Sequence, residues 1–262
     1  MAITTPIKIL LFVAASLAAY ATLVEPIWLE IDEYQIGSDD ANARITVLHL
    51  SDLHLHDFGR RERAVINAIA VARPDIVVLS GDVIDQRDAL PVLKQFLSEL
   101  PPTQTVAVPG NWEHWAGVDF TAMAATYAEH KATLLVNTTL EVSIRGRKVQ
   151  ITGLDDHTGG QPVLPLTAAL PADLSILIQH SPAWFTEPGF GTRRYELCLA
   201  GHTHGGQVTL FGRPLWRPQG SGHFIAGMYQ LAGCPLHVSR GIGTSILPIR
   251  FGARPHISVL TL

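Results

Sequence analysis

The sequence predicts an α/β protein, a β-sheet sandwich flanked by helices and preceded by one N-terminal apolar helix. In the first half, short apolar runs alternate with segments of helical spacing, which is typical of βαβ units and a mostly parallel sheet. The second half has more strand character, and one uncharged apolar run precedes both halves. With 262 residues, of which 47% are hydrophobic, the chain can form one sizeable core.

The N-terminal apolar run extends from Ile9 to Val24 without a charged residue, and Lys8 precedes it. We therefore expect residues 1–29 to form a membrane anchor or signal segment. An uncleaved transmembrane or signal-anchor helix, with Trp28 at the membrane interface, is favoured over a buried core helix. A cleaved signal peptide stays open as the alternative, because Ala19-Tyr20-Ala21 resembles a cleavage site.

The charges beside this segment bear on its orientation. Lys8 lies on one side and acidic residues from Glu25 to Glu33 lie on the other, which indicates an N-terminus in the cytoplasm. A single lysine leaves the side of the membrane open. Residues 30–43 are polar and acidic and are expected to form a linker, so that the folded domain spans residues 44–262.

Three strands and three helices are expected in the first half of this domain. Each strand is a short apolar run that ends in polar residues, and the proline residues at 74 and 101 stop the first two helices. The expected strands are Ile45–Leu50, Ile76–Leu79 and Thr105–Val108. The expected helices are Arg60–Ala72, Ala89–Leu100 and Val118–His130.

The second half is expected to begin with a β-hairpin, in which Glu141–Ile144 and Val149–Thr152 flank the turn residues 145–148. Five further strands follow it. They are Leu174–Gln179, Leu197–Ala200, Gln207–Leu210, Leu236–Ser239 and Ile257–Leu262.

Charge and cysteine content narrow the function classes. The formal net charge is −4, so nothing indicates a nucleic-acid partner. The two cysteines, Cys198 and Cys234, lack the CxxC spacing of a zinc site. We expect free buried thiols, with a single bridge as the alternative. The twelve histidines are many for this length, and histidine is the commonest transition-metal ligand.

Potential metal ligands follow the expected strands. They are Asp52, His54, Asp82, Asn111, His180, His202 and His204. The carboxyl ends of strands in an open α/β sheet converge on one crevice, so these residues can meet at one edge. Mixed Asp, His and Asn ligands suit Mn²⁺, Fe or Zn²⁺ better than Mg²⁺ or Ca²⁺. Seven ligands, with one bridging carboxylate, fit two metals about 3.5–4 Å apart.

Five motifs in this order resemble the calcineurin-like metallophosphoesterases from about Ile45 to the C-terminus. They are Asp52-Leu53-His54, Gly81-Asp82, Gly110-Asn111, His180 and Gly201-His202-Thr203-His204. Residues 199–207 and 238–243 look like the membrane-associated branch of that family. This branch includes UDP-diacylglucosamine pyrophosphatases of lipid A synthesis and related phosphodiesterases.

The resemblance implies a metallophosphoesterase-type sandwich with two metal ions. Mn²⁺ is expected ahead of Fe or Zn²⁺. One metal would be held by Asp52, His54, Asp82 and His204. The other would be held by Asp82, Asn111, His180 and His202, with Asp82 as the bridge. A metal-bridging hydroxide is then expected to attack phosphorus in line.

The sequence departs from the family at one position. The usual Gly-Asn-His-Asp/Glu motif, whose His protonates the leaving group, here reads Gly110-Asn111-Trp112-Glu113-His114. Either His114 reaches round to donate the proton, or no strong acid is needed because the leaving group is weakly basic. The second option favours pyrophosphate or activated diester substrates. His114 and Asn111 are therefore the candidate catalytic residues.

Other residues have weaker signals. Arg240 and Asp156 are the candidate substrate-binding residues, and Arg250 is a further cation that could bind phosphate. A structural ion pair explains either arginine equally well. Asp155, Asp156 and His157 could support the site from a Gly-flanked loop. Six aromatic residues form either an acyl-binding wall or ordinary core. They are Trp112, Trp115, Phe120, Trp184, Phe185 and Phe190.

The expected function is hydrolysis of a phosphodiester or pyrophosphate bond in a phosphorylated small molecule or lipid, with UDP-2,3-diacylglucosamine as the named candidate. An extracytoplasmic, broad-specificity phosphodiesterase is the alternative enzyme. A catalytically silent metal-binding interaction module is the alternative of a different class, which Trp112 raises and the complete ligand set opposes.

Overall fold

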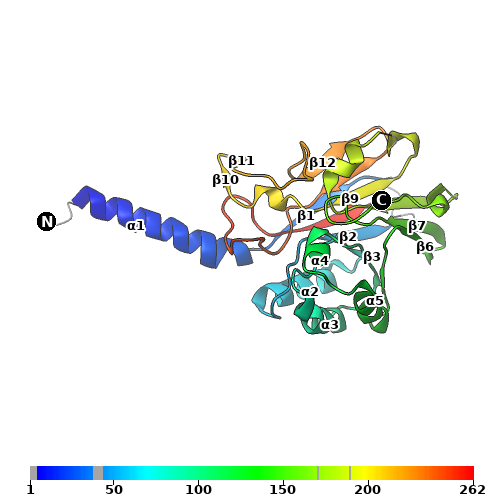
Figure 1. Ribbon diagram of the computed structural model, residues 1–262, viewed down its shortest axis with the longest axis horizontal. Coiled ribbons are helices and arrows are strands. Elements are labelled where there is room, and N and C mark those ends of the chain that lie inside the picture. The colour runs from blue at the N-terminus through cyan, green and yellow to red at the C-terminus, as the bar shows by residue number, and fades with distance from the viewer. Residues whose placement is uncertain (1–4, 38–43, 170, 189) are drawn as a thin grey trace.

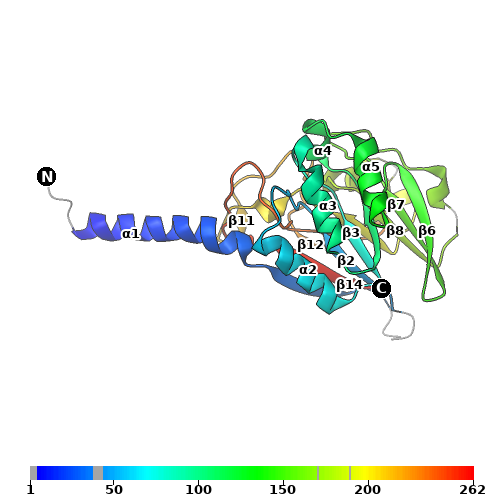
Figure 2. The same cartoon turned by 90° about the horizontal axis from the view of Figure 1, so that it is seen from below.

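The structure, a computed structural model, describes residues 5–37, 44–169, 171–188 and 190–262. Two six-stranded sheets pack face to face, helices cover the outer face of one sheet, and one long helix projects from the domain (Figures 1 and 2). The predicted α/β sandwich with its N-terminal apolar helix is confirmed.

The first sheet has the order β1-β14-β2-β3-β4-β5 and contains the buried apolar runs of the first half. Its strands are β1 Glu30–Gln35, β2 Thr46–Leu50, β3 Ile76–Leu79, β4 Gln104–Ala107, β5 Ala132–Leu134 and β14 His256–Thr261. Strands β2 to β5 run parallel, so their carboxyl ends lie at one edge.

Helices cover the outer face of this sheet. They are α2 Arg60–Ala72, α3 Leu90–Ser98 and α5 Phe120–Glu129, with the short α4 Asn111–Trp115 directly after β4 and the 3₁₀ turn η3 Arg87–Ala89 before α3. Helix α5 begins two residues later than expected. Asp119 is its N-cap, because the carboxylate accepts a hydrogen bond from the Thr121 backbone N–H at 2.8 Å.

The second sheet has the order β12-β13-β9-β8-β7-β6. Its strands are β6 Thr138–Ile144, β7 Arg147–Gly153, β8 Leu174–Ile178, β9 Leu197–Ala200, β12 Gly227–Gln230 and β13 Pro235–Val238. The expected hairpin is β6–β7, and its turn residues Arg145 and Gly146 both have positive φ, as a tight hairpin turn requires. The remaining elements are the small hairpin β10 Thr209–Leu210 and β11 Arg213–Pro214, and the 3₁₀ turns η4 Leu166–Ala169, η5 Pro182–Thr186, η6 Phe190–Thr192 and η7 His204–Gly206.

Three apolar clusters hold these layers together. One lies between the two sheets and includes Val78, Val106, Ile151 and Ile176. A second joins the first sheet to α2, α3 and α5, and a third packs on the far face of the second sheet. The sheets are thereby fixed relative to each other at the edge where their carboxyl ends meet.

The expected linker at residues 30–43 needs a correction, because its first part is strand β1. Glu30 pairs with His256 and Gln35 with Thr261 along the neighbouring strand β14. The charged pattern of β1 suits an edge strand, and its partner lies at the opposite end of the chain, so local sequence did not reveal it. Residues 38–43 of the expected linker lie outside the described residues.

The cysteines also differ from the expectation, because Cys198 and Cys234 form a disulfide. Cys198 lies in β9, and Cys234 directly precedes β13, the parallel neighbour of β9. Their Cα atoms lie 6.1 Å apart, within the ordinary range for a disulfide. The pairing depends on a strand adjacency that the spacing of 36 residues did not indicate.

The N-terminal helix α1 Thr5–Ala19 continues through a π-helical turn, η1 Tyr20–Val24, and a 3₁₀ turn, η2 Glu25–Ile27. Together Thr5–Ile27 form a helical segment of 23 residues with a mean hydropathy of 2.1. Within its apolar window of 18 residues, only 6% of the residues are buried. This segment is long and apolar enough to cross a membrane.

Candidate metal centre

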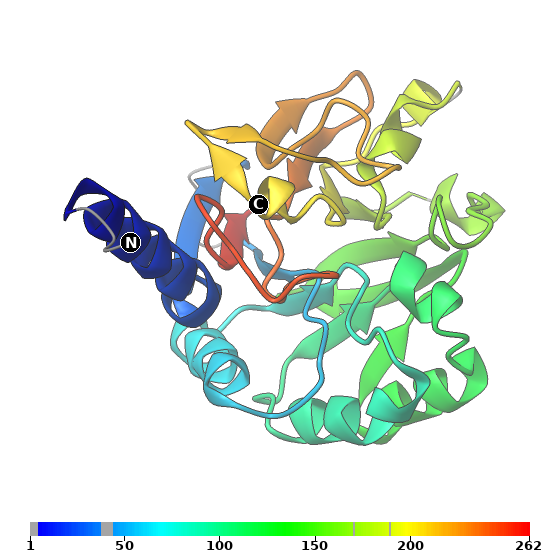
Figure 3. The same cartoon turned by 60° about the vertical axis from the view of Figure 1, so that its left-hand side comes forward.

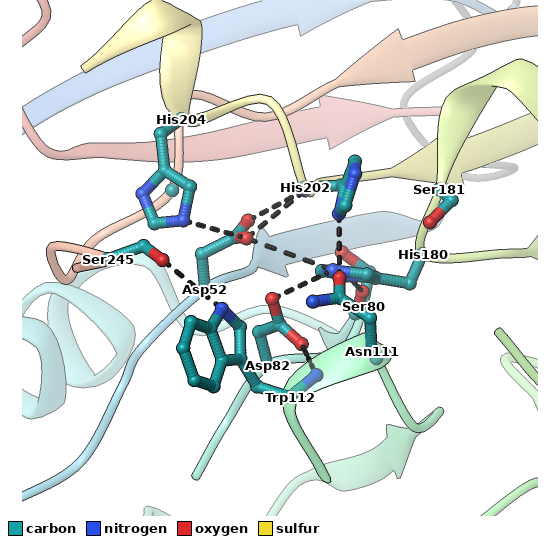
Figure 4. Close-up of polar contacts among 12 residues, drawn as sticks. Asp52, Ser80, Asp82, Asn111, Trp112, His180, Ser181, His202, His204 and Ser245 are labelled. Atoms are coloured by element: carbon teal, nitrogen blue, oxygen red, sulfur yellow. Dashed lines mark hydrogen bonds and ion pairs between the residues drawn. The ribbon is translucent and has the colours of Figure 1, made fainter. Parts of the chain in front are cut away.

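The candidate ligands follow the carboxyl ends of strands from both sheets (Figure 4). Asp52 and His54 follow β2, Asp82 follows β3, and Asn111 begins α4 after β4, while His180 follows β8, and His202 and His204 follow β9. Two buried groups have ligand atoms within 4.8 Å of one another. They are Asp52, His54 and His204, and Asp82, His180 and His202.

The ring nitrogens on the inner side of the site face oxygens or other nitrogens at short range. His180 Nε2 lies 3.1 Å from Asp82 Oδ2, and His204 Nε2 lies 3.3 Å from Asp52 Oδ1. His54 Nε2 lies 3.3 Å from His204 Nε2. His202 Nδ1 lies 2.7 Å from Asn111 Oδ1, which brings the amide into the second group.

The outer ring nitrogens of three histidines face groups that only accept hydrogen bonds. His54 Nδ1 lies 3.0 Å from Asp85 Oδ2. His180 Nδ1 lies 2.7 Å from the Ser80 carbonyl, and His202 Nε2 lies 2.6 Å from the Gln219 carbonyl. In a neutral imidazole, the outer nitrogen then carries the proton and the inner nitrogen carries a lone pair. Sequence reasoning missed Asp85 and Gln219.

This arrangement fits a metal centre. The inner lone pairs of His54 and His180 point at the Asp82 carboxylate, an arrangement that repels unless a cation or a proton lies between them. His180 Nε2, for example, is buried without a hydrogen-bond partner among the described residues, although Asp82 is adjacent. Imidazoles that donate their outer N–H to an oxygen are the usual form of metal-ligating histidine.

The electrostatics of the site agree with this interpretation. Burial raises the pKa of Asp52, but His204, His180 and His54 outweigh burial and bring that pKa below its usual range. Burial lowers the pKa of His180, but the Asp82 carboxylate raises it well above the ordinary value. Burial lowers the pKa of His204, so this residue stays neutral, as a ligand must. The carboxylates therefore stabilise added positive charge.

Five of the seven candidate ligands adopt the left-handed backbone region. They are Asp52, His54, Asp82, His202 and His204, with φ between 44° and 70°. Non-glycine residues seldom adopt positive φ, and such strained residues cluster at functional sites. The loops after the strands are thus held in unfavourable conformations that aim these side chains into one place.

Glu113 supports this geometry from below. Its buried carboxylate accepts hydrogen bonds from the backbone N–H groups of Gly110, Asp82, Val83 and Ile84. Burial, with the neighbouring Asp82 charge, raises the pKa of Glu113 to about 7. A side chain at Gly110 would collide with the Asp82 carboxylate, so glycine is required there. Glu113 therefore ties two ligand loops together.

A cavity of about 740 Å³ opens above the candidate ligands. Its floor includes Asp82, Asn111, His202 and His204. Its walls are mainly apolar and include Trp112, Trp115, Leu215, Trp216, Ile246 and Leu247. Of the six aromatic residues expected as an acyl-binding wall, Trp112 and Trp115 line the cavity. Phe120 packs on His114, while Trp184, Phe185 and Phe190 belong to the cluster on the second sheet.

Trp112 and His114 occupy different surroundings. The Trp112 indole lines the cavity and donates its N–H to Ser245 Oγ at 3.1 Å (Figure 4). His114 Nε2 lies 2.6 Å from Asp155 Oδ1, whose hydrogen bond raises the pKa of His114. His114 is not among the described residues that line the cavity. Its direct contacts therefore connect it to Asp155 rather than to the cavity.

The two expected substrate-binding residues, Asp156 and Arg240, are engaged by other parts of the protein. Asp156 is fully buried, and its carboxylate accepts hydrogen bonds from Ser181, Thr158 and Gly159, so it orders its own loop. Arg240 pairs with Glu30 at 2.6 Å and Asp32 at 3.3 Å, which joins it to edge strand β1. Arg240 thus forms the ion pairs that the alternative expected, and neither residue lines the cavity.

A sheet sandwich that carries two groups of Asp, His and Asn ligands beneath an open cavity defines the class of metal-dependent phosphoesterases. Residues 45–206 match the family of calcineurin-like phosphoesterases, and the chain belongs to this family. It is 32% identical to the metallophosphoesterase YkuE of Bacillus subtilis, over 93% of this chain and 88% of that protein. It is 28% identical to the phosphodiesterase YaeI of Escherichia coli, over 93% of this chain and 92% of that protein.

A bovine transmembrane protein with a metallophosphoesterase domain is also 28% identical, over 83% of this chain and 53% of that protein. These relatives agree with an enzyme that hydrolyses phosphate esters.

Proposed function

We propose that the protein is a membrane-anchored phosphodiesterase that binds two divalent ions, Mn²⁺ in preference to Fe or Zn²⁺. The observation that carries this proposal is that the inner lone pairs of His54 and His180 face the Asp82 carboxylate, an arrangement that a cation or a proton between them relieves. The mixed nitrogen and oxygen donor set favours these metals over Mg²⁺ and Ca²⁺.

Each ion has its own residues in this proposal. Asp52, His54 and His204 would hold one, and Asn111, His180 and His202 would hold the other. Asp82 would bridge them, because its Oδ2 lies 4.0 Å from His54 Nε2 and 3.1 Å from His180 Nε2. When bound, such ions neutralise phosphoryl oxygens and lower the pKa of water.

The protein's own groups set which leaving groups are tolerated. Trp112 occupies the position of the family's usual acid, and an indole N–H that donates to Ser245 is not a proton source. His114 is held by Asp155. We therefore expect substrates whose leaving oxygen departs without protonation, which are aryl diesters, pyrophosphates and other activated diesters.

The disulfide supports a catalytic domain outside the cytoplasm. Disulfides persist in oxidising compartments and are rare in the cytosol. The single Lys8 before the apolar helix supports the same orientation. Because UDP-linked intermediates are cytoplasmic, we favour an extracytoplasmic phosphodiesterase over hydrolysis of UDP-2,3-diacylglucosamine.

One assay tests this function. The purified full-length chain, stripped of metal by chelation and then supplied with Mn²⁺, is expected to hydrolyse bis(p-nitrophenyl) phosphate, with little UMP release from UDP-2,3-diacylglucosamine. Rapid UMP release would restore the nucleotide-linked lipid as substrate. Two bound metals without turnover of any diester or pyrophosphate would instead support the silent metal-binding module.

A further inference from the structure

Large apolar side chains lie exposed at the mouth of the cavity and on the hairpin beside it. We call Leu210, Phe211, Leu215, Trp216, Ile246 and Leu247 the apolar rim, and each is between 52% and 96% exposed. Exposed apolar residues scattered singly are ordinary, but contiguous patches mark interaction surfaces.

The rim is contiguous because its two segments are bonded to each other. One is the hairpin β10–β11 with the residues after it, and the other is the loop at residues 244–250. Thr209 N–H donates to the Phe251 carbonyl at 2.7 Å, and Gln207 Nε2 donates to the Leu247 carbonyl at 3.0 Å. The rim is therefore one surface built from two loops.

The tips of both loops are conformationally unfavourable. Phe211 has φ 51° at the turn of its hairpin, where Asn, Asp and Gly are preferred. Ile246 has φ 64°, which is a real outlier for a β-branched residue. Phe211 is 96% exposed and Ile246 is 76% exposed, so burial within the protein does not offset this cost. Strain combined with exposure indicates that the side chains serve a purpose outside the fold.

The loop at residues 244–250, which carries one part of the rim, runs beside the end of the apolar helix (Figure 3). The Arg250 backbone N–H donates to the Ala21 carbonyl at 2.9 Å, and the Tyr20 ring packs edge-on against Phe251. Ile27 and Trp28, at the end of the same segment, are each 50% exposed. The end of the helix that would enter the membrane therefore lies next to the loop that carries Ile246 and Leu247.

We propose that the apolar rim docks on the lipid bilayer that holds α1, with Phe211 and Ile246 inserted at the interface. Arg213 and Arg217 are exposed beside the rim and suit the phosphate level of the bilayer, where long cationic side chains bury their stems and keep the charge in water. The exposed Trp28 and Trp216 suit the same level, where tryptophan is enriched.

Docking would place the mouth of the cavity against the membrane. Leu215, Trp216, Ile246 and Leu247 belong to the rim and also line the cavity, so an apolar path leads from the bilayer to the floor. This consequence rests on the proposed function and names its substrate class. The substrate is an amphipathic phosphodiester, which reaches the floor with its phosphate while its apolar part stays at the rim.

Tryptophan quenching tests the docking without turnover. The full-length chain is reconstituted into phosphatidylcholine and phosphatidylglycerol bilayers that carry brominated acyl chains. The fluorescence lost in Trp216→Phe defines the Trp216 component, which we expect to be quenched. The component defined in the same way by Trp184→Phe is the control and should not be quenched, because Trp184 packs on the second sheet. An unquenched Trp216 component would overturn the proposal, and concentration-dependent dimers that shield it would assign the rim to a second copy instead.

A second experiment tests the substrate class. Phe211→Asp is expected to lower hydrolysis of a diacylglycerol nitrophenyl phosphodiester in bilayers by about tenfold, from the lost burial of one phenyl ring. Hydrolysis of bis(p-nitrophenyl) phosphate should stay unchanged, because Phe211 does not line the cavity. Leu166→Asp is the matched control, since Leu166 is 87% exposed in η4, which adjoins the edge strand β6 of the second sheet. Equal loss on both substrates, or on neither, would contradict the proposal. If the parent hydrolyses neither, the proposed function fails while the quenching result still decides the docking.

Discussion

The floor of the cavity and its rim lie at the same opening and are built in opposite ways. The floor is polar and buried, and the outer nitrogens of His54, His180 and His202 are paired with oxygens. The rim is apolar, and its side chains are exposed. This difference teaches that chemistry and substrate access are carried by separate residues. Changes to the floor should alter metal binding and the turnover of every substrate. Changes to the rim should alter only the turnover of substrates that reach the cavity from the bilayer.

The largest effect should come from the shared carboxylate of the floor. Asp82→Asn removes the charge that would bridge both ions, so metal content should fall and turnover of bis(p-nitrophenyl) phosphate should drop by at least about 10³-fold. Elemental analysis and initial rates measure both quantities.

The exposed Asp88→Asn is the matched control, because it makes the same chemical change in η3, away from the floor. If Asp82→Asn kept two metals and full turnover, the floor would not be a metal centre that depends on Asp82.

A smaller effect should come from the residue that orients His54. Asp85→Asn weakens the acceptor of the His54 outer N–H, so Mn²⁺ affinity should fall by roughly 10–100-fold. Metal titration followed by activity should show recovery at high Mn²⁺. An unchanged Mn²⁺ affinity would mean that the hydrogen bond to Asp85 does not orient the His54 ring for metal binding.

His114→Ala should have less effect than either change to the floor. Because His114 pairs with Asp155 rather than lining the cavity, rates on aryl diesters should fall by less than the roughly 10²–10⁴-fold that general acid catalysis supplies. Rates on a series of aryl and alkyl phosphodiesters measure this. A leaving-group dependence that is flat in the parent and steep in His114→Ala would identify His114 as the acid after all.

The smallest effect should follow deletion of residues 1–19. No residue of α1 is buried, so the free energy of unfolding should change by less than about 0.5 kcal/mol, and aryl diester turnover should persist. Deletion of residues 1–30 is the contrast. It removes the buried Glu25, which accepts a hydrogen bond from the Ala253 backbone N–H, and should cost about 1–3 kcal/mol. Equal denaturation midpoints for the two truncations would contradict this boundary.

Sequence patterns predicted the floor better than the rim. Buried strands such as Ile76–Leu79 end in polar residues, and parallel strands bring those ends together, so the clustering of Asp82 with His180 followed from topology. Neither composition nor periodicity predicted the left-handed φ angles of the ligand residues.

What the sequence left open depends on contacts between distant segments. Strand β1 pairs with β14 across the full length of the chain, and Cys234 meets Cys198 only because β13 lies beside β9. The sequence also does not show the partners of Asp156 and Arg240, which are Ser181 and Glu30. The rim could not be recognised from the sequence, because the sequence does not show that Phe211 and Ile246 are exposed rather than buried.

The most direct test of the central claim is crystallographic. Crystals of the protein grown with Mn²⁺, and measured at the manganese absorption edge, should show two anomalous peaks in the floor. One should lie within ligand distance of Asp52, His54 and His204, the other within ligand distance of Asn111, His180 and His202, and Asp82 should touch both. Ordered side chains with a single peak, or with no peak among these residues, would contradict the account.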